Sequence, residues 1–138
     1  MKKLFVITMV FAAAFLMGNT HAQAAQATQG GQGDKATTIQ GELVDLGCYL
    51  SMGAKGADHR SCAEKCINSG MPMGVLTSDG ALYLLTENHD NLDPFNSAKQ
   101  MAADQVSVTG PISERNGMKS IEVKEIKNLS GEQKAPKG

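Results

Sequence analysis

Apolar and polar residues alternate between Val44 and Leu50, and Cys48 falls in phase with the apolar positions. A period of two is typical of a half-buried β-strand, because successive side chains point to opposite faces of the sheet. The sequence therefore predicts a first strand over these residues, with Cys48 on the same inward face as Val44 and Leu46.

A short helix is predicted further along the chain. The run Ser61-Cys62-Ala63-Glu64 matches the S-x-x-E capping box, in which the serine and glutamate side chains satisfy free amides of a first helical turn. Asn68-Ser69-Gly70 supplies the stop signal. A helix that begins at Ser61 would place Cys62 and Cys66 one turn apart on the same face.

Two turn signals separate the later apolar runs. Asp79-Gly80 divides the run 74–77 from the run 81–85, which is the pattern of a β-hairpin. Asn116-Gly117 marks a second turn, which leads into a strand over 119–126. Between these hairpins, residues 94–103 have the apolar spacing of another short helix, and a strand begins at Val106.

Together these elements predict a mainly β, small α+β domain over residues 38–128, with five short strands and one or two short helices. We expect the strands to form an antiparallel barrel, because Gly110-Pro111 would bend the fourth strand. The strand order and the V-x-V-x-G phrase at 106–110 resemble OB-like barrels of exported bacterial proteins. A flat α+β sheet is the alternative.

The two ends of the chain differ from this domain in composition. Two lysines precede an apolar run over residues 4–17, and Ala22-Gln23-Ala24 has the A-x-A form of a cleavage site. These features predict a signal peptide over residues 1–24, and hence a periplasmic or secreted protein without membrane attachment after cleavage. Residues 25–37 and 129–138 are small and polar, so we expect a disordered linker and a disordered tail.

The charge balance narrows the choice of partners. The chain has 13 basic and 14 acidic residues, a net charge of −1, and the predicted leader removes two lysines and no acids. A mildly acidic surface does not suit nucleic acid or anionic lipid, which need clustered cations. No catalytic triad, phosphate-binding loop or carboxylate pair is visible in the sequence. We expect a monomer without catalytic activity, whose partner is a metal ion or another exported protein.

The candidate chemistry is concentrated in four residues with the spacing C-x10-H-x2-C-x3-C: Cys48, His59, Cys62 and Cys66. Three thiolates and an imidazole form a Cys3His set, which suits tetrahedral Zn²⁺. Thiolate ligands equally favour Cu(I). The sequence therefore predicts a metal site, with Zn²⁺ or Cu(I) as the ion and Asp45 either facing solvent or holding His59 by a hydrogen bond.

Two other uses of the sulfurs stay open. Cysteines of exported proteins commonly form disulfides, and a bond from Cys48 to Cys62 or Cys66 would staple the first strand to the helix. The protein would then be a stapled binding module without catalytic activity. Because the cysteine count is three, one thiol would be left over beside His59, which a staple does not explain. A thiol redox protein is the third possibility.

Five features follow one another along the chain: D-x-x-C-Y at 45–49, H-x-x-C-x-x-x-C at 59–66, G-x-P-x-G at 70–74, a hairpin that contains Tyr83, and V-x-V-x-G at 106–110. In combination they resemble a group of small exported bacterial proteins of uncharacterised function. The resemblance covers roughly residues 39–127. It implies an OB-like β-barrel and supplies no activity, so the function has to come from the residues themselves.

Overall fold

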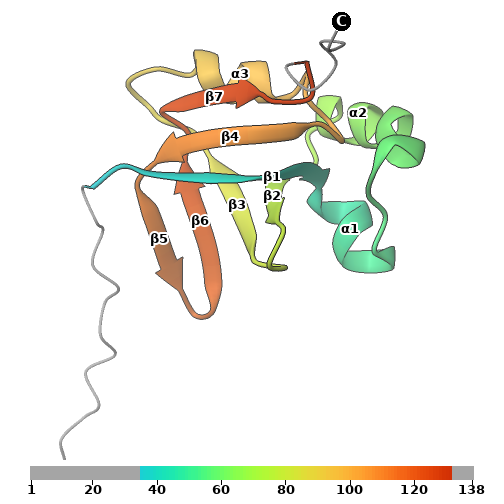
Figure 1. The fold of residues 1–138 in the computed structure, drawn as a ribbon, viewed down its shortest axis with the longest axis horizontal. Coiled ribbons are helices and arrows are strands. Elements are labelled where there is room, and N and C mark those ends of the chain that lie inside the picture. The colour runs from blue at the N-terminus through green and yellow to red at the C-terminus, as the bar shows by residue number, and fades with distance from the viewer. Residues whose placement is uncertain (1–34, 132–138) are drawn as a thin grey trace, which may run out of the picture.

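The computed structural model describes residues 35–131, and within them seven strands form one sheet with short helices at its sides (Figure 1). The predicted signal peptide, most of the predicted linker and residues 132–138 of the predicted tail lie outside the described residues. The strands are β1 (Thr37–Asp45), β2 (Met73–Thr77), β3 (Leu82–Thr86), β4 (Gln105–Gly110), β5 (Ile112–Arg115), β6 (Met118–Glu122) and β7 (Glu125–Asn128). The helices are α1 (Leu46–Met52), the single 3-10 turn η1 (Ala57–His59), α2 (Arg60–Asn68) and α3 (Asp93–Ala98).

The sheet is open and mixed, with the strand order β5-β6-β3-β2-β1-β4-β7. Neighbouring strands are antiparallel except for β3 and β6, which run parallel. The prediction of a mainly β, small α+β domain is confirmed. The prediction of a closed five-stranded antiparallel barrel is wrong, because the structure has seven strands in an open sheet with β5 and β7 at its edges, and β3 and β6 run parallel.

The last four strands form one long, bent antiparallel ribbon. Pro111 joins β4 to β5, and Val123-Lys124 joins β6 to β7, so the single strand predicted over 119–126 is divided in two. The ladder continues across the bend, since the Glu122 amide donates to the Pro111 carbonyl oxygen at 3.1 Å and the Lys124 amide to that of Thr109 at 3.0 Å. In Figure 1 the two halves run in clearly different directions, and they pair at opposite ends of the sheet.

Both predicted hairpins are confirmed. Gly80 has a φ of 85° in the turn between β2 and β3, and Asn116 and Gly117 have φ values of 51° and 82° between β5 and β6. Positive φ at both central residues is the geometry that an N-G turn supplies. The helix predicted over 94–103 is shorter than expected, because α3 ends at Ala98.

Two apolar clusters lie on the two faces of the sheet. Along β1 and β2, Leu43 and Val75 belong to the main core, whereas their neighbours Val44 and Leu76 belong to a smaller cluster. Alternation along a strand puts these sets on opposite faces. The main core is closed by α2 and α3 through Ala63, Ile67 and Ala98, and the smaller cluster is closed by Leu46 and Tyr49 of α1. No helix within residues 35–131 combines the length and the hydropathy needed to cross a membrane.

Because of the close contact at the bend of the ribbon, the stability of the fold should be sensitive to a side chain at Gly110. A Cβ at this position would collide with the carbonyl oxygen of Glu122, so Gly110→Ala should lower the free energy of unfolding by about 1–3 kcal/mol, the usual cost of overpacking. Gly131→Ala is the control, since a Cβ there meets no described atom. Urea unfolding of both variants measures the difference, and equal stabilities would contradict the close crossing.

Candidate metal centre

Asp45 ends β1 and begins α1. Its Oδ1 accepts a hydrogen bond from the Gly47 amide at 2.9 Å, and its Oδ2 accepts one from the Cys48 amide at 3.3 Å. An N-cap carboxylate satisfies amides that have no partner within the helix. The prediction of a strand through Cys48 is therefore wrong, and so is the expectation that Asp45 faces solvent, because this residue is only 1% exposed.

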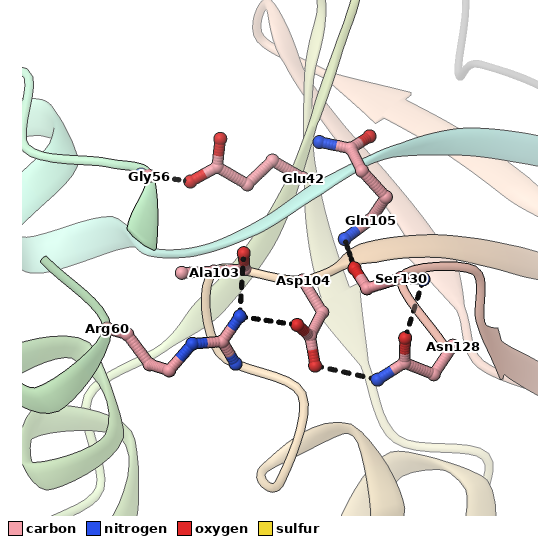
Figure 2. Close-up of polar contacts among 8 residues, drawn as sticks. All are labelled: Glu42, Gly56, Arg60, Ala103, Asp104, Gln105, Asn128 and Ser130. Atoms are coloured by element: carbon pink, nitrogen blue, oxygen red, sulfur yellow. Dashed lines mark hydrogen bonds and ion pairs between the residues drawn. The ribbon is translucent and has the colours of Figure 1, made fainter. Parts of the chain in front are cut away.

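The loop after α1 folds back so that α2 lies beside α1. The carboxylate of Glu42 on β1 accepts a hydrogen bond from the Gly56 amide and holds the middle of this loop (Figure 2). The helix α2 begins at Arg60, with His59 as its N-cap and without a side-chain cap. The capping box predicted at Ser61 is therefore wrong, although the helix does carry Cys62 and Cys66 and does end at Asn68.

The fold brings the three cysteines together. The Sγ atoms of Cys48 on α1 and of Cys62 and Cys66 on α2 all lie within 4.8 Å of one another. Cys62 is exposed, whereas Cys48 and Cys66 are half-buried, and all three are free thiols. The predicted sulfur cluster is present within residues 35–131, and the structure contains no disulfide staple between these cysteines.

His59 lies beside Cys48, and among the described residues no group of donors within 4.8 Å of one another joins it to Cys62 or Cys66. A ring nitrogen of His59, a carboxylate oxygen of Asp45 and the Sγ of Cys48 lie within 4.8 Å of one another. Nε2 of His59 is buried and has no hydrogen-bond partner among the described residues. A buried polar atom without a partner costs free energy, so this nitrogen is available to a ligand that would satisfy it. Cys48 belongs to both groups of donors.

Both half-buried thiols favour their protonated form. The hydrogen bond to the Asp45 carboxylate is the main cause that raises the pKa of Cys48 to about 12, and burial and the negative charge of Asp45 act in the same direction. Burial also raises the pKa of Cys66, and its contacts with Cys62 add to this effect. A metal ion that binds here must displace protons from the sulfurs, and its charge would offset the carboxylate beside them.

Comparison with known proteins supplies no relative: no protein-family model, no curated protein and no solved structure gives a significant match to the chain. A function for this chain therefore has to follow from the chemistry of the site itself.

A polar network fixes the start of α2 (Figure 2). Arg60 donates from Nη2 to the carboxylate of Asp104 and, at 3.3 Å, to the carbonyl oxygen of Ala103. Asn128 donates to the second oxygen of Asp104 at 2.6 Å. The hydrogen bond from Arg60 holds the pKa of Asp104 below its ordinary value, and Asp104 raises the pKa of Arg60. Since Arg60 follows His59 directly, this ion pair fixes the position of the histidine and of the cysteine-bearing helix.

The network extends into the end of the described chain. The Ser130 hydroxyl accepts a hydrogen bond from the Gln105 amide at 2.9 Å, and the Ser130 amide donates to Asn128 Oδ1 at 2.8 Å. The Leu129 amide donates to the Gln105 carbonyl oxygen at 2.7 Å. Residues 129 and 130 therefore bond to the beginning of β4.

A separate groove of about 840 Å³ lies beside α1. Its walls are mainly apolar and come from α1, from Pro72 before β2, from β3 and from the β5–β6 hairpin: Leu46, Leu50, Pro72, Leu82, Leu84 and Met118. Lys119 and Ser51 also line it, but no cysteine, histidine or carboxylate does. The groove therefore offers mainly apolar surface, and the candidate metal ligands lie at the cysteine cluster.

The Arg60–Asp104 pair predicts a pH-dependent loss of stability. Asp104→Asn should lower the free energy of unfolding by about 1–3 kcal/mol at pH 7, because it removes a hydrogen bond to a buried charged group. The folded-state pKa of Asp104 is depressed, so its contribution is present above the unfolded pKa of about 4 and is lost as the pH falls through the folded pKa.

Urea unfolding of wild type and Asp104→Asn at pH 7 and pH 3 tests this expectation. The difference between the two proteins should shrink at the lower pH. Asp90→Asn is the matched control, because Asp90 is an exposed residue whose replacement also removes one carboxylate. A difference that is the same at both pH values would contradict the ion pair as its source.

Proposed function

We propose that this protein binds one soft or borderline metal ion, Zn²⁺ or Cu(I), through Cys48, Cys62 and Cys66. The observation that carries the proposal is the convergence of three free thiols within 4.8 Å of one another, beside a buried imidazole nitrogen without a partner. Thiolates and imidazole are the ligands that both ions take in proteins.

The separation of the sulfurs is close to that of a metal–thiolate site. In a tetrahedral zinc site with Zn–S bonds of about 2.3 Å, the sulfurs are about 3.8 Å apart. The upper limit of 4.8 Å in this structure exceeds that value by only about 1 Å, which a change of side-chain rotamer can close. Two sulfurs come from α2 and the third from α1, so the ion would join the two helices.

His59 distinguishes the two metals. Zn²⁺ prefers four ligands, and His59, which lies within 4.8 Å of Cys48 and Asp45, could complete a Cys3His set. Cu(I) can be held by thiolates alone, and the three sulfurs already form a trigonal set. We infer that His59 contributes more to the affinity for Zn²⁺ than to the affinity for Cu(I).

The biological setting follows from the predicted leader. An exported protein with a partly exposed thiolate site suits storage or delivery of the metal ion, to or from another exported protein. Cys62 is the exposed ligand, so exchange of the ion would begin there. Nothing in this function requires a catalytic step, and the resemblance to small exported bacterial proteins stays a prediction.

The site predicts a stoichiometry of one Zn²⁺ per chain for the fully reduced protein. Replacing any one of the three cysteines with serine should lower the affinity by about 100-fold or more, which exceeds the loss typical of residues that only orient a ligand. Ser61→Ala is the control, because Ser61 is exposed and adjacent to Cys62. Titration against a chromophoric chelator measures each affinity, and binding that survives replacement of all three cysteines would place the site elsewhere.

Histidine variants test the assignment of the fourth ligand. His59→Ala should weaken Zn²⁺ binding roughly 10- to 100-fold and weaken Cu(I) binding less than about 10-fold, because thiolates alone satisfy Cu(I). His89→Ala is the matched control, since His89 is exposed in the loop after β3. Competition titrations with both metals measure the two losses. An equal loss for Zn²⁺ and Cu(I) would contradict the preference of His59 for Zn²⁺, and unchanged Zn²⁺ binding would exclude His59 as a zinc ligand.

Metal affinity should rise with pH. The raised pKa values of Cys48 and Cys66 mean that these thiols are protonated at neutral pH and must release protons on binding. Each proton released adds about one decade of apparent affinity per pH unit, so the slope should lie between roughly one and three decades. Replacing Cys48 with serine should lower this slope by about one. Affinities measured between pH 6 and pH 8 give the slope, and a value near zero would rule out thiol ligands.

A further inference from the structure

We infer that the same cluster carries out dithiol–disulfide exchange, in which Cys62 attacks an external disulfide and Cys48 resolves the mixed disulfide. The product is an interhelical Cys48–Cys62 bond, which would exclude the metal. The exchange itself depends only on the arrangement of the thiols, and only its effect on the metal rests on the proposed function.

Exposure assigns the attacking thiol. Cys62 is the exposed cysteine of the three, while Cys48 and Cys66 are half-buried. An external disulfide, whether on a small molecule or on another protein, must bring one of its sulfurs close to an accessible thiolate. Cys62 therefore meets the oxidant first and forms the mixed disulfide.

Helical geometry assigns the resolving thiol. Cys62 and Cys66 lie four residues apart in the continuous helix α2, where Cβ atoms are about 5–6 Å apart. A disulfide needs Cβ atoms about 3.5–4.5 Å apart, so a bond between these two would require α2 to unwind. The end of α2 opposes this, because the Cys66 carbonyl oxygen accepts hydrogen bonds from the Ser69 and Met71 amides.

Cys48 has no such restriction. It lies on α1, and its Sγ is within 4.8 Å of the Sγ of Cys62. A bond between α1 and α2 is not governed by the geometry of one helix, and a small shift of either side chain brings the sulfurs together. Any intramolecular disulfide that forms without unwinding of α2 must therefore include Cys48.

The reaction balances as two exchanges. The Cys62 thiolate attacks one sulfur of the external disulfide, the Cys62–sulfur bond forms and one external thiolate leaves. Cys48 then loses its proton and attacks the Cys62 sulfur, the Cys48–Cys62 bond forms and the second external thiolate leaves. The two protein thiols lose two electrons and two protons, and the external disulfide is reduced to two thiols. Of the three cysteines, only Cys66 then has a free thiol that could bind a metal ion.

The test uses reduced, metal-free protein treated with oxidised glutathione, followed by acid quenching, alkylation and peptide mass mapping. In wild type, free thiols should fall from three to one per chain, with a Cys48–Cys62 linkage. Cys66→Ser should form the same linkage. Cys48→Ser should instead accumulate a glutathione adduct at Cys62, since its resolving thiol is missing. Circular dichroism verifies that each variant is folded.

Three outcomes would overturn the inference. They are an intramolecular bond in Cys48→Ser, a lasting glutathione adduct in wild type, and a first linkage in wild type that leaves Cys62 free. A parallel sample loaded with Zn²⁺ should release one ion per chain to a chelator on oxidation. Disulfide formation in a protein that binds neither Zn²⁺ nor Cu(I) in the titrations would overturn the proposed function alone. Zn²⁺ binding without the Cys48–Cys62 bond would overturn the exchange alone.

Discussion

The buried carboxylate of Asp45 is the interaction on which the candidate site depends. A carboxylate that is only 1% exposed is costly unless donors surround it, and the first amides of α1 supply them. The strand β1 ends at this cap and α1 begins directly after it. Cys48 on α1 therefore lies next to the cysteines of α2. The same carboxylate raises the pKa of Cys48 and lies close to His59. A cation bound at the cluster would therefore offset the negative charge of the Asp45 carboxylate, which positions its ligands.

The helix α2 is held in place by contacts other than those of Asp45, so the cysteine cluster depends on the tertiary fold. Arg60 begins α2 and is paired with Asp104 at the start of β4, while Glu42 holds the loop that joins the helices. Both helices are thus attached to the same sheet, one by its cap and the other by an ion pair. Because neither attachment uses a sulfur, the thiols can change ligands or partners without loss of the contacts that position them.

The sequence predicted the elements that have local signals and missed those that depend on distant partners. Asp79-Gly80 and Asn116-Gly117 determine their own turn geometry, so both hairpins were predicted correctly. In a segment as short as α1, a strand pattern with a period of 2 residues and a helix pattern with a period of 3.6 residues share several apolar positions, so the residues around Cys48 looked like a strand. Asp45 is a residue type that often forms a helix N-cap, and this was the signal that would have identified the helix. The parallel pairing of β3 with β6 and the division of the ribbon at Pro111 are set by contacts far apart in the chain. Residue type and spacing singled out Cys48, His59, Cys62 and Cys66 as candidates, and the structure brings the three cysteines together. The burial of Asp45 could not be predicted in this way, because it depends on the packing of α1 and α2 against the sheet.

The proposed metal site and the proposed disulfide exclude one another, and one residue is common to both. A metal ion would use all three sulfurs, whereas a disulfide would use two and leave the third. Because α2 keeps Cys62 and Cys66 too far apart for an unstrained bond, oxidation has to pass through α1, whose one thiol is Cys48. The proposed metal site also requires Cys48, since this residue belongs to both groups of possible metal donors. The hydrogen bond to Asp45 raises the pKa of this thiol to about 12, so both proposed reactions require Cys48 to release a proton.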